Sequence, residues 1–212
     1  METFSDIHER VGAYYDAKLA EHGATHRGVD WNSEASQQLR FDQLLRVADL
    51  SRPFSLNDYG CGHGSLAAYL AGLGADVRYH GYDVSEAMVA TARERLAGEK
   101  VAFTTSRANL AVADVTVASG IFNVLAGTSA ARWERYVEET IRDMASVSRR
   151  GIAFNMLTSY SDADRMTPRL HYADPLRIFD WCKRNLARRV ALLHDYELYE
   201  FTMIVRLGEG AR

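Results

Sequence analysis

Cysteine, proline and long apolar runs are all scarce in this sequence. Its 212 residues include only three prolines and two cysteines, Cys61 and Cys182, which lie far apart. So few cysteines exclude a small fold held by disulfides and fit a reducing compartment. The apolar runs are shorter than the roughly 20 residues that a membrane-spanning helix needs, and the N-terminal METFSDIHER lacks the apolar core of a signal peptide. We therefore expect a cytoplasmic protein with no membrane association.

An excess of positive charge is also missing. The chain has 25 lysines and arginines against 28 acidic residues, for a net charge of −3. Binding to nucleic acid depends on clustered lysine and arginine side chains that neutralise phosphates, so we do not expect nucleic acid as the main partner. The segment 142–189 is richer in arginine. Solvated helix faces and helix C-termini explain it most simply, and a weak anionic or tRNA-facing patch is the alternative.

What is present fits one globular domain over residues 1–212, as a monomer or a homodimer. Apolar residues between Ile7 and Leu19 recur at helical spacing, and the pattern stops at Gly23. Ser33 is a plausible N-cap for a second helix, which Pro53 ends. We therefore expect a helical N-terminal cap over residues 1–50 and a core over residues 54–212.

From residue 54 onward, short apolar strands alternate with helices. The expected strands are 54–59, 77–82, 101–105, 115–119 and 152–156, and the expected helices between and after them are 65–73, 86–96, 130–147 and 175–185. Such alternation requires crossover connections and a parallel sheet. Two last strands, 189–194 and 200–206, are too close for a crossover and must form an antiparallel hairpin. The fold class is therefore α/β, doubly wound and mostly parallel, with a C-terminal antiparallel hairpin.

The most informative motif is LNDYGCGHG, at residues 56–64, which follows one expected strand and opens a helix. Its glycines, Gly60, Gly62 and Gly64, permit a sharp turn and close approach of a ligand to the backbone. An acid, Asp58, stands two residues before the first glycine. A carboxylate there would repel a pyrophosphate but could bind an ammonium group. The motif therefore predicts a nucleoside ligand with a positively charged amino-acid tail.

A second acid, Asp83, ends the next expected strand, about 20 residues after the glycines, the separation expected of a carboxylate that binds ribose hydroxyls. LNDYGCGHG and the later GYDVSEAMVATARER resemble the first two motifs of the class I methyltransferases that depend on S-adenosylmethionine (SAM). The resemblance implies a seven-stranded sheet, SAM as methyl donor and S-adenosylhomocysteine as product. By carry-over, Asp58, Gly60 and Gly62 would line the methionine portion, Asp83 would hold the ribose, and Val84 and Met88 would border the adenine.

Two departures from the family pattern affect the expected contacts. Many members carry an acid near the adenine amine, whereas this chain reads TSRANL, so the backbone of Arg107 and Ala108 or the amide of Asn109 would serve instead. After the fourth strand the chain has Ser119 and Gly120 rather than an Asn-Pro-Pro-Tyr-type motif, which argues against methylation of bases or glutamine. The remaining expected cofactor contacts are Cys61, Gly64, Ser119, Gly120, Tyr14 and Trp31.

The expected reaction is methyl transfer to an O or N atom of a small-molecule acceptor. His171 or Tyr172, in the loop after the fifth strand, would face the acceptor as a base, although a capped loop before Pro175 also explains them. Tyr14 and Trp31 would belong to a lid, or else to a helix packed on the sheet. The alternatives are an RNA or protein methyltransferase and a nucleotide-binding module without catalysis.

Other candidate chemistry is better explained by ordinary structural roles. Asp162 and Asp164 lie in a polar loop, so we expect no metal ion. Cys61 lies near a helix N-terminus, where a thiol can become reactive, but a small residue packed under the cofactor is the simpler interpretation. His63 is expected to be a solvent-facing spacer within the glycine loop.

Overall fold

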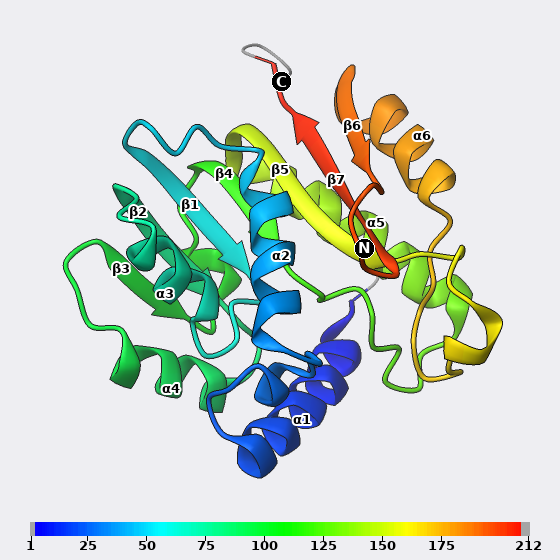
Figure 1. Ribbon diagram of the computed structural model, residues 1–212, viewed down its shortest axis with the longest axis horizontal. Helices are drawn as coiled ribbons and strands as arrows, with labels where there is room; N and C mark the ends of the chain where they lie inside the picture. Colours follow the sequence, from blue (N-terminus) through cyan, green and yellow to red (C-terminus); the bar gives the residue numbers. More distant parts are fainter. Residues whose placement is uncertain (1–2, 209–212) are drawn as a thin grey trace.

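A computed structural model describes residues 3–208 and has a twisted sheet between two layers of helices (Figure 1). The strands are β1 (Phe54–Tyr59), β2 (Val77–Tyr82), β3 (Val101–Thr104), β4 (Ala113–Ala118), β5 (Ser148–Leu157), β6 (Arg189–Leu193) and β7 (Glu200–Arg206). The helices are α1 (Ser5–His22), α2 (Glu34–Leu45), α3 (Ser65–Gly72), α4 (Glu86–Arg95), α5 (Ala130–Ser146) and α6 (Pro175–Asn185), with short 3-10 turns η1 (Arg27–Val29), η2 (Arg107–Asn109) and η3 (Ala163–Arg165).

The seven strands form one sheet in the order β3-β2-β1-β4-β5-β7-β6. The first five strands pair in parallel, and β7 runs antiparallel both to β5 and to β6. The expected mostly parallel sheet with a C-terminal hairpin is therefore confirmed. Because β7 is reversed, its first residue, Glu200, lies beside Leu157, the last residue of β5. The hairpin thus brings a side chain to the edge of the sheet where the parallel strands end.

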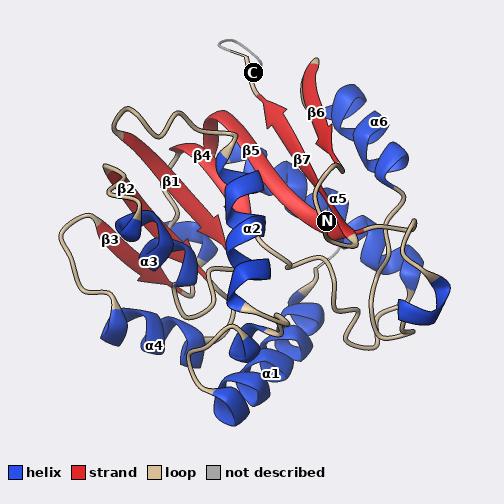
Figure 2. Ribbon diagram, in the orientation of Figure 1, coloured by secondary structure: helices blue, strands red, loops and turns tan. Residues whose placement is uncertain are grey.

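Helices cover both faces of the sheet, as a parallel sheet requires. Figure 2 shows α2 and α3 in front of the strands, α5 behind them, and α1 below the ends of the central strands. One apolar cluster, which includes Leu44, Leu56 and Leu70, fills the front layer. A second, which includes Trp133 and Phe154, fills the layer that contains α5. Burial on both faces explains why most residues of the central strands β1 and β4 are buried.

Helix starts follow the capping signals in the sequence. The Ser33 hydroxyl accepts a hydrogen bond from the Ser36 N–H at 3.1 Å, and the Ser36 hydroxyl accepts one from the Ser33 N–H at 3.3 Å. Ser85 caps α4 by accepting from the Met88 N–H at 3.0 Å. The Asp174 carboxylate caps α6 in the same way. These caps fix where the chain enters each helix.

The clearest difference from expectation lies in β5, which begins at Ser148 rather than at residue 152. Arg149 and Arg150 belong to the strand although both are exposed. Their polarity interrupts the apolar periodicity that marks the rest of the strand, because this end of β5 faces solvent. Among the helices of residues 3–208, none is both long and apolar enough to cross a bilayer.

Candidate active site

A cavity lies where β1, β2 and β4 end, the edge at which open α/β sheets bind ligands. The loop after β1 contributes Gly60 and Gly62, and the end of β2 contributes Asp83. The segment after β4 contributes Ser119 and Gly120. Segments far apart in the sequence, including α1, the segment after η1 and α5, supply the other walls. The structure thus brings together two predicted motifs and part of the N-terminal cap.

The glycine loop can adopt its path only with glycine at two of its turns. Gly60 has φ +82°, and a Cβ atom there would lie 2.2 Å from Cγ2 of Ile121. Gly62 has φ +52°, and its Cβ would lie 3.0 Å from Cγ1 of Val29. Both φ angles are in the left-handed region that favours glycine. The Gly60 N–H donates to the Tyr82 carbonyl at 2.7 Å, which anchors the loop to the end of β2.

Asp83 joins the glycine loop to helix α4. One carboxylate oxygen accepts from the Gly62 N–H at 2.8 Å, and the other accepts from the Ser85 N–H at 2.9 Å. A carboxylate has about four acceptor positions, so each oxygen keeps acceptor capacity for a ligand. The carboxylate is therefore held in one orientation at the cavity wall before any ligand arrives.

Ser119 leaves a polar atom unpaired at the opposite side of the glycine loop. Its Oγ is buried and has no hydrogen-bond partner among the described residues. An unsatisfied buried hydroxyl costs about 1–3 kcal/mol. Because Ser119 also lines the cavity, a bound ligand with a polar group could supply the missing partner.

Three residues of the first motif lie behind the glycine loop and do not line the cavity. Asp58 is buried and accepts a hydrogen bond from the Tyr79 hydroxyl at 2.5 Å. Burial raises the pKa of the Asp58 carboxyl to about 7. Cys61 is buried as well, and burial raises the pKa of its thiol well above the usual value, so the thiolate is scarce. Gly64 allows tight packing, because a Cβ there would lie 2.6 Å from Cδ1 of Leu96.

The expected adenine contacts divide into two groups. Val84 and Met88 line the cavity. Arg107 and Ala108 do not, because η2 is tied to α5 and turned toward solvent. Arg107 Nε and Nη2 donate to the two oxygens of Asp143 at 2.5 and 2.7 Å, and Ala108 is exposed.

The two residues expected to face the acceptor also lie outside the cavity lining. The His171 N–H donates to the Asn123 carbonyl at 2.8 Å, which pairs its loop with the segment after β4. The Tyr172 hydroxyl accepts from the Thr167 N–H at 3.0 Å and so ties the loop to itself. The structure therefore does not bring His171 or Tyr172 to the glycine loop.

The N-terminal cap has two parts with different positions. Trp31 and one face of α1 border the cavity, whereas α2 packs on the sheet. Tyr14 turns away from the cavity and donates to Asp30 at 2.5 Å, while its neighbour Tyr15 lines it.

Several residues that line the cavity were not among the expected site residues, and His8 and Tyr136 are two of them. His8, Val11 and Tyr15 are spaced as one helical face, which is the signal that could have pointed to the first of them. Tyr136 lies on α5, and nothing in its spacing marks it as a cavity residue.

Polar contacts at the protein surface hold α1 against the rest of the chain. Asp6 accepts from Arg132 at 2.6 Å, and Asp16 accepts a hydrogen bond from the Ser85 hydroxyl.

The expectation that His63 faces solvent is wrong. Its side chain is buried, with Nε2 3.0 Å from the Thr25 carbonyl oxygen, because the segment before η1 covers the glycine loop.

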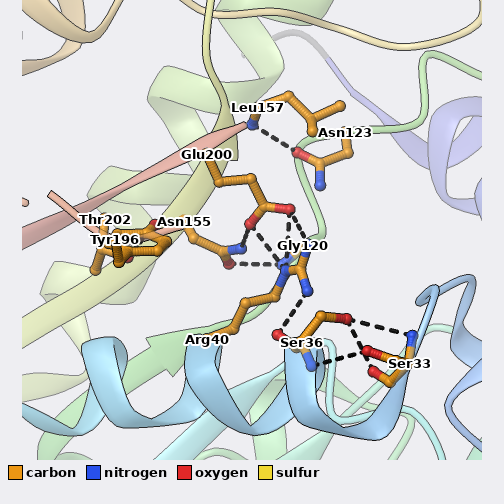
Figure 3. Close-up of polar contacts among 10 residues, drawn as sticks. All are labelled: Ser33, Ser36, Arg40, Gly120, Asn123, Asn155, Leu157, Tyr196, Glu200 and Thr202. Atoms are coloured by element: carbon orange, nitrogen blue, oxygen red, sulfur yellow. Dashed lines mark hydrogen bonds and ion pairs between the residues drawn. The ribbon is translucent and has the colours of Figure 1, made fainter. Parts of the chain in front are cut away.

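A closed circuit of contacts fixes the boundary between the cap and the strand ends, and Figure 3 shows its polar part, from Gly120 through Asn155 and Glu200 to Arg40. The Gly120 N–H donates to Asn155 Oδ1 at 2.9 Å, and the Asn155 amide donates to Glu200. Glu200 accepts from Arg40 Nε at 2.9 and 3.0 Å. The Arg40 guanidinium lies 3.9 Å from the centre of the Trp31 ring. The Trp31 indole in turn packs against Gly120, because a Cβ atom on Gly120 would lie 2.5 Å from the indole.

Both charges of this circuit are almost fully enclosed. The side chains of Arg40 and Glu200 are 8% and 1% exposed. Arg40 also donates to the Ser36 carbonyl at 2.6 Å. A buried ion pair is stable only when its hydrogen bonds are nearly all satisfied. The circuit meets that condition and sets the position of Trp31 at the cavity wall.

Glu200→Gln should therefore destabilise the protein by about 3 kcal/mol, because Arg40 remains buried without its counter-charge. Denaturant unfolding measures the loss. The double variant Arg40→Met, Glu200→Leu should recover much of the stability, since it removes both charges. Asp180→Asn, which breaks the exposed pair with Arg184, is the control and should have little effect. Equal losses for the buried and the exposed variant would show that enclosure of the pair does not matter for stability.

Asp58 should make the stability of the ligand-free protein depend on pH. Its pKa rises from 3.8 to about 7 on burial, so the folded state holds a proton that the unfolded state releases between these values. Stability therefore falls as pH rises from about 4 to 7. Asp58→Asn keeps an acceptor for Tyr79 and removes this contribution. Melting temperatures are measured from pH 5 to 8. The melting temperature of the variant should increase relative to that of the wild type as pH rises. If the difference between the two stays constant with pH, the pKa assigned to Asp58 is wrong.

Comparison with known proteins agrees with this geometry. Residues 57–151 match a family described as a methyltransferase domain. A Mycobacterium tuberculosis protein, Rv1506c, whose name assigns it to the methyltransferases, is 47% identical over 163 residues, which cover 76% of this chain and 98% of that protein.

Solved structures share the fold at low sequence identity. SAM-bound magnesium protoporphyrin IX methyltransferase from Synechocystis is 18% identical, covers 98% of both chains and has a TM-score of 0.62. The 1,6-didemethyltoxoflavin-N1-methyltransferase from Burkholderia thailandensis is 17% identical, covers 98% of this chain and 91% of its own, and has a TM-score of 0.66. Together with the extended match to Rv1506c, they show that the chain belongs to the class I SAM-dependent methyltransferases.

Proposed function

We propose that this enzyme transfers the methyl group of SAM to an oxygen or nitrogen atom of a small-molecule acceptor. The observation that carries the proposal is the kind of residue that forms the cavity walls. Its walls include the uncharged rings of Tyr15, Trp31, Tyr59 and Tyr136, and the glycine loop and Asp83 lie on one side. Aromatic walls of this kind suit a compact, partly apolar molecule better than a polyanion.

The cavity residues fit the cofactor part by part. Gly60 and Gly62 leave room for close approach of the methionine portion to the backbone, and the unpaired Ser119 hydroxyl is suited to bind its polar end. Asp83 is held where its remaining acceptor positions can take the two ribose hydroxyls. Val84 and Met88 offer apolar contact to the base. Asp58 would act indirectly, by holding β1 against Tyr79 of β2 beneath the loop.

SAM carries an already activated methyl group, so the protein mainly has to position the acceptor and exclude water. Trp31 and Ile121 lie at the Ser119 side of the cavity, which suits them to hold the acceptor in line with the methyl group. Closure by α1 and the segment through Trp31 would keep water out. Two structural neighbours are named as methyltransferases of magnesium protoporphyrin IX and of 1,6-didemethyltoxoflavin, which supports an acceptor of the small-molecule class.

Three arginines of segment 142–189 pair with neighbouring carboxylates, which weakens the case for a nucleic-acid acceptor. Arg149 pairs with Asp114, Arg177 with Glu138 and Arg184 with Asp180. Paired guanidinium groups are poorly placed to attract phosphates. We therefore favour a small molecule over RNA.

Binding of the cofactor product tests the site residues. S-adenosylhomocysteine should raise the melting temperature of the wild type, and NAD should not. Asp83→Asn should weaken S-adenosylhomocysteine by about 10-fold or more in calorimetry, because hydrogen bonds to a charged acceptor contribute about 1.5–3 kcal/mol. Asp180→Asn serves as the matched surface control. Undiminished affinity in Asp83→Asn would remove that residue from the ribose site.

Methyl transfer to each acceptor class can be compared directly. Purified protein is given methyl-labelled SAM with a metabolite extract, with total RNA or with total protein, and the label is followed in each fraction. The expected result is label in the metabolite fraction, where mass spectrometry can identify the product. Label confined to RNA or protein would overturn the small-molecule proposal.

A further inference from the structure

The end of the cavity beyond Asp83 lacks the polar partner that the sequence predicted in the segment after β3. Arg107 is committed to Asp143, and Asn109 donates to Thr104 Oγ1 at 3.2 Å. Ala108 and Asn109 are exposed, and no residue of η2 lines the cavity. The residues that line this end of the cavity therefore come from other parts of the chain.

Helices α1 and α5 wall this end of the cavity instead. α1 lies against Val84, since a Cβ on Gly12 would lie 3.8 Å from Val84 Cγ2. One turn earlier on α1, His8 lines the cavity and meets Tyr136 of α5 edge to face, with ring centroids 5.6 Å apart. Tyr82, next to Asp83 in the sequence, lines the same end. The result is an aromatic slot next to the carboxylate proposed to hold the ribose.

Few polar groups in this slot are free to meet a ligand. The Tyr59 hydroxyl donates its hydrogen to Asp143 at 3.0 Å, so it has no donor left for a ligand. Within residues 3–208, no hydrogen bond reaches the ring nitrogens of His8 or the hydroxyl of Tyr82. Burial lowers the pKa of His8, which favours the neutral imidazole, and in that form one ring nitrogen can accept a hydrogen bond.

We propose that His8 recognises the adenine of SAM, with an unprotonated ring nitrogen accepting a hydrogen bond from the 6-amino group. Tyr82 and Tyr136 pack against the base, which an aromatic slot suits by shape and stacking. The inference rests on the proposed ribose site at Asp83, because that carboxylate fixes which end of the cavity holds the base. Helix α1 then has two tasks, since it covers the cofactor and also distinguishes its base.

The test compares two ligands that differ only at the 6-position. S-adenosylhomocysteine carries the amino group, and its 6-deaminopurine analogue carries a hydrogen atom there, which neither donates to nor accepts from His8. In calorimetry, the wild type should bind the adenosyl form about 5- to 10-fold more tightly, the effect of one hydrogen bond. His8→Phe should weaken the adenosyl form about 5- to 10-fold and change the deaminopurine form by less than about 2-fold. His8→Gln keeps an acceptor and should retain part of the preference.

His22→Phe, at the other end of α1, is the matched control and should keep the wild-type preference. If His8→Phe does not fold, as judged by thermal unfolding, His8→Ala takes its place, because it adds no bulk. The proposal is overturned if the wild type binds both ligands equally, or if removal of His8 leaves the preference intact. Failure of the wild type to bind either ligand would instead count against the cofactor site as a whole, so the two failures are distinguishable.

Discussion

The buried ion pair between Arg40 and Glu200 sets the geometry on which the rest of the site depends. Two enclosed charges are tolerated only in an arrangement that satisfies nearly all their hydrogen bonds, and this arrangement includes Asn155 and the carbonyl of Ser36. The reversed direction of β7 is what makes the pair possible. A parallel last strand would begin at the other edge of the sheet and carry its first residue away from the cap. The hairpin therefore contributes to the site as well as to the core.

The glycine loop separates the core from the cavity. Asp58 and Cys61 face the packed layer under α3 and α4, whereas Gly60 and Gly62 present bare backbone to the cavity. The acid of the first motif thus stabilises the loop from beneath, through Tyr79, and the acid at the end of β2 binds it from the cavity side. The two carboxylates have different roles because Asp58 lies within β1, where the strand is buried, whereas Asp83 follows the last residue of β2 at the edge of the sheet.

Much of this architecture could be predicted from the sequence, because its signals are local. β1, β2 and α6 begin and end where apolar periodicity, Asp174 and Pro175 indicate, and the glycine loop and Asp83 follow from spacing alone. The start of β5 could not be predicted, since Arg149 and Arg150 look like loop residues. His8, Ile121 and Tyr136 come from three separate segments, and only tertiary packing brings them to one cavity. The same packing buries His63, which local sequence had suggested would face water.

The two parts of the cap are fastened in different ways. Trp31 is held by an enclosed circuit that solvent ions cannot reach, whereas α1 is held by Asp6 and Asp16 at the surface. Salt screens exposed charges strongly and enclosed ones weakly. Rising ionic strength therefore weakens the Asp6–Arg132 attachment of α1 before it affects the indole wall. The cavity therefore has one wall that responds to salt and one that does not.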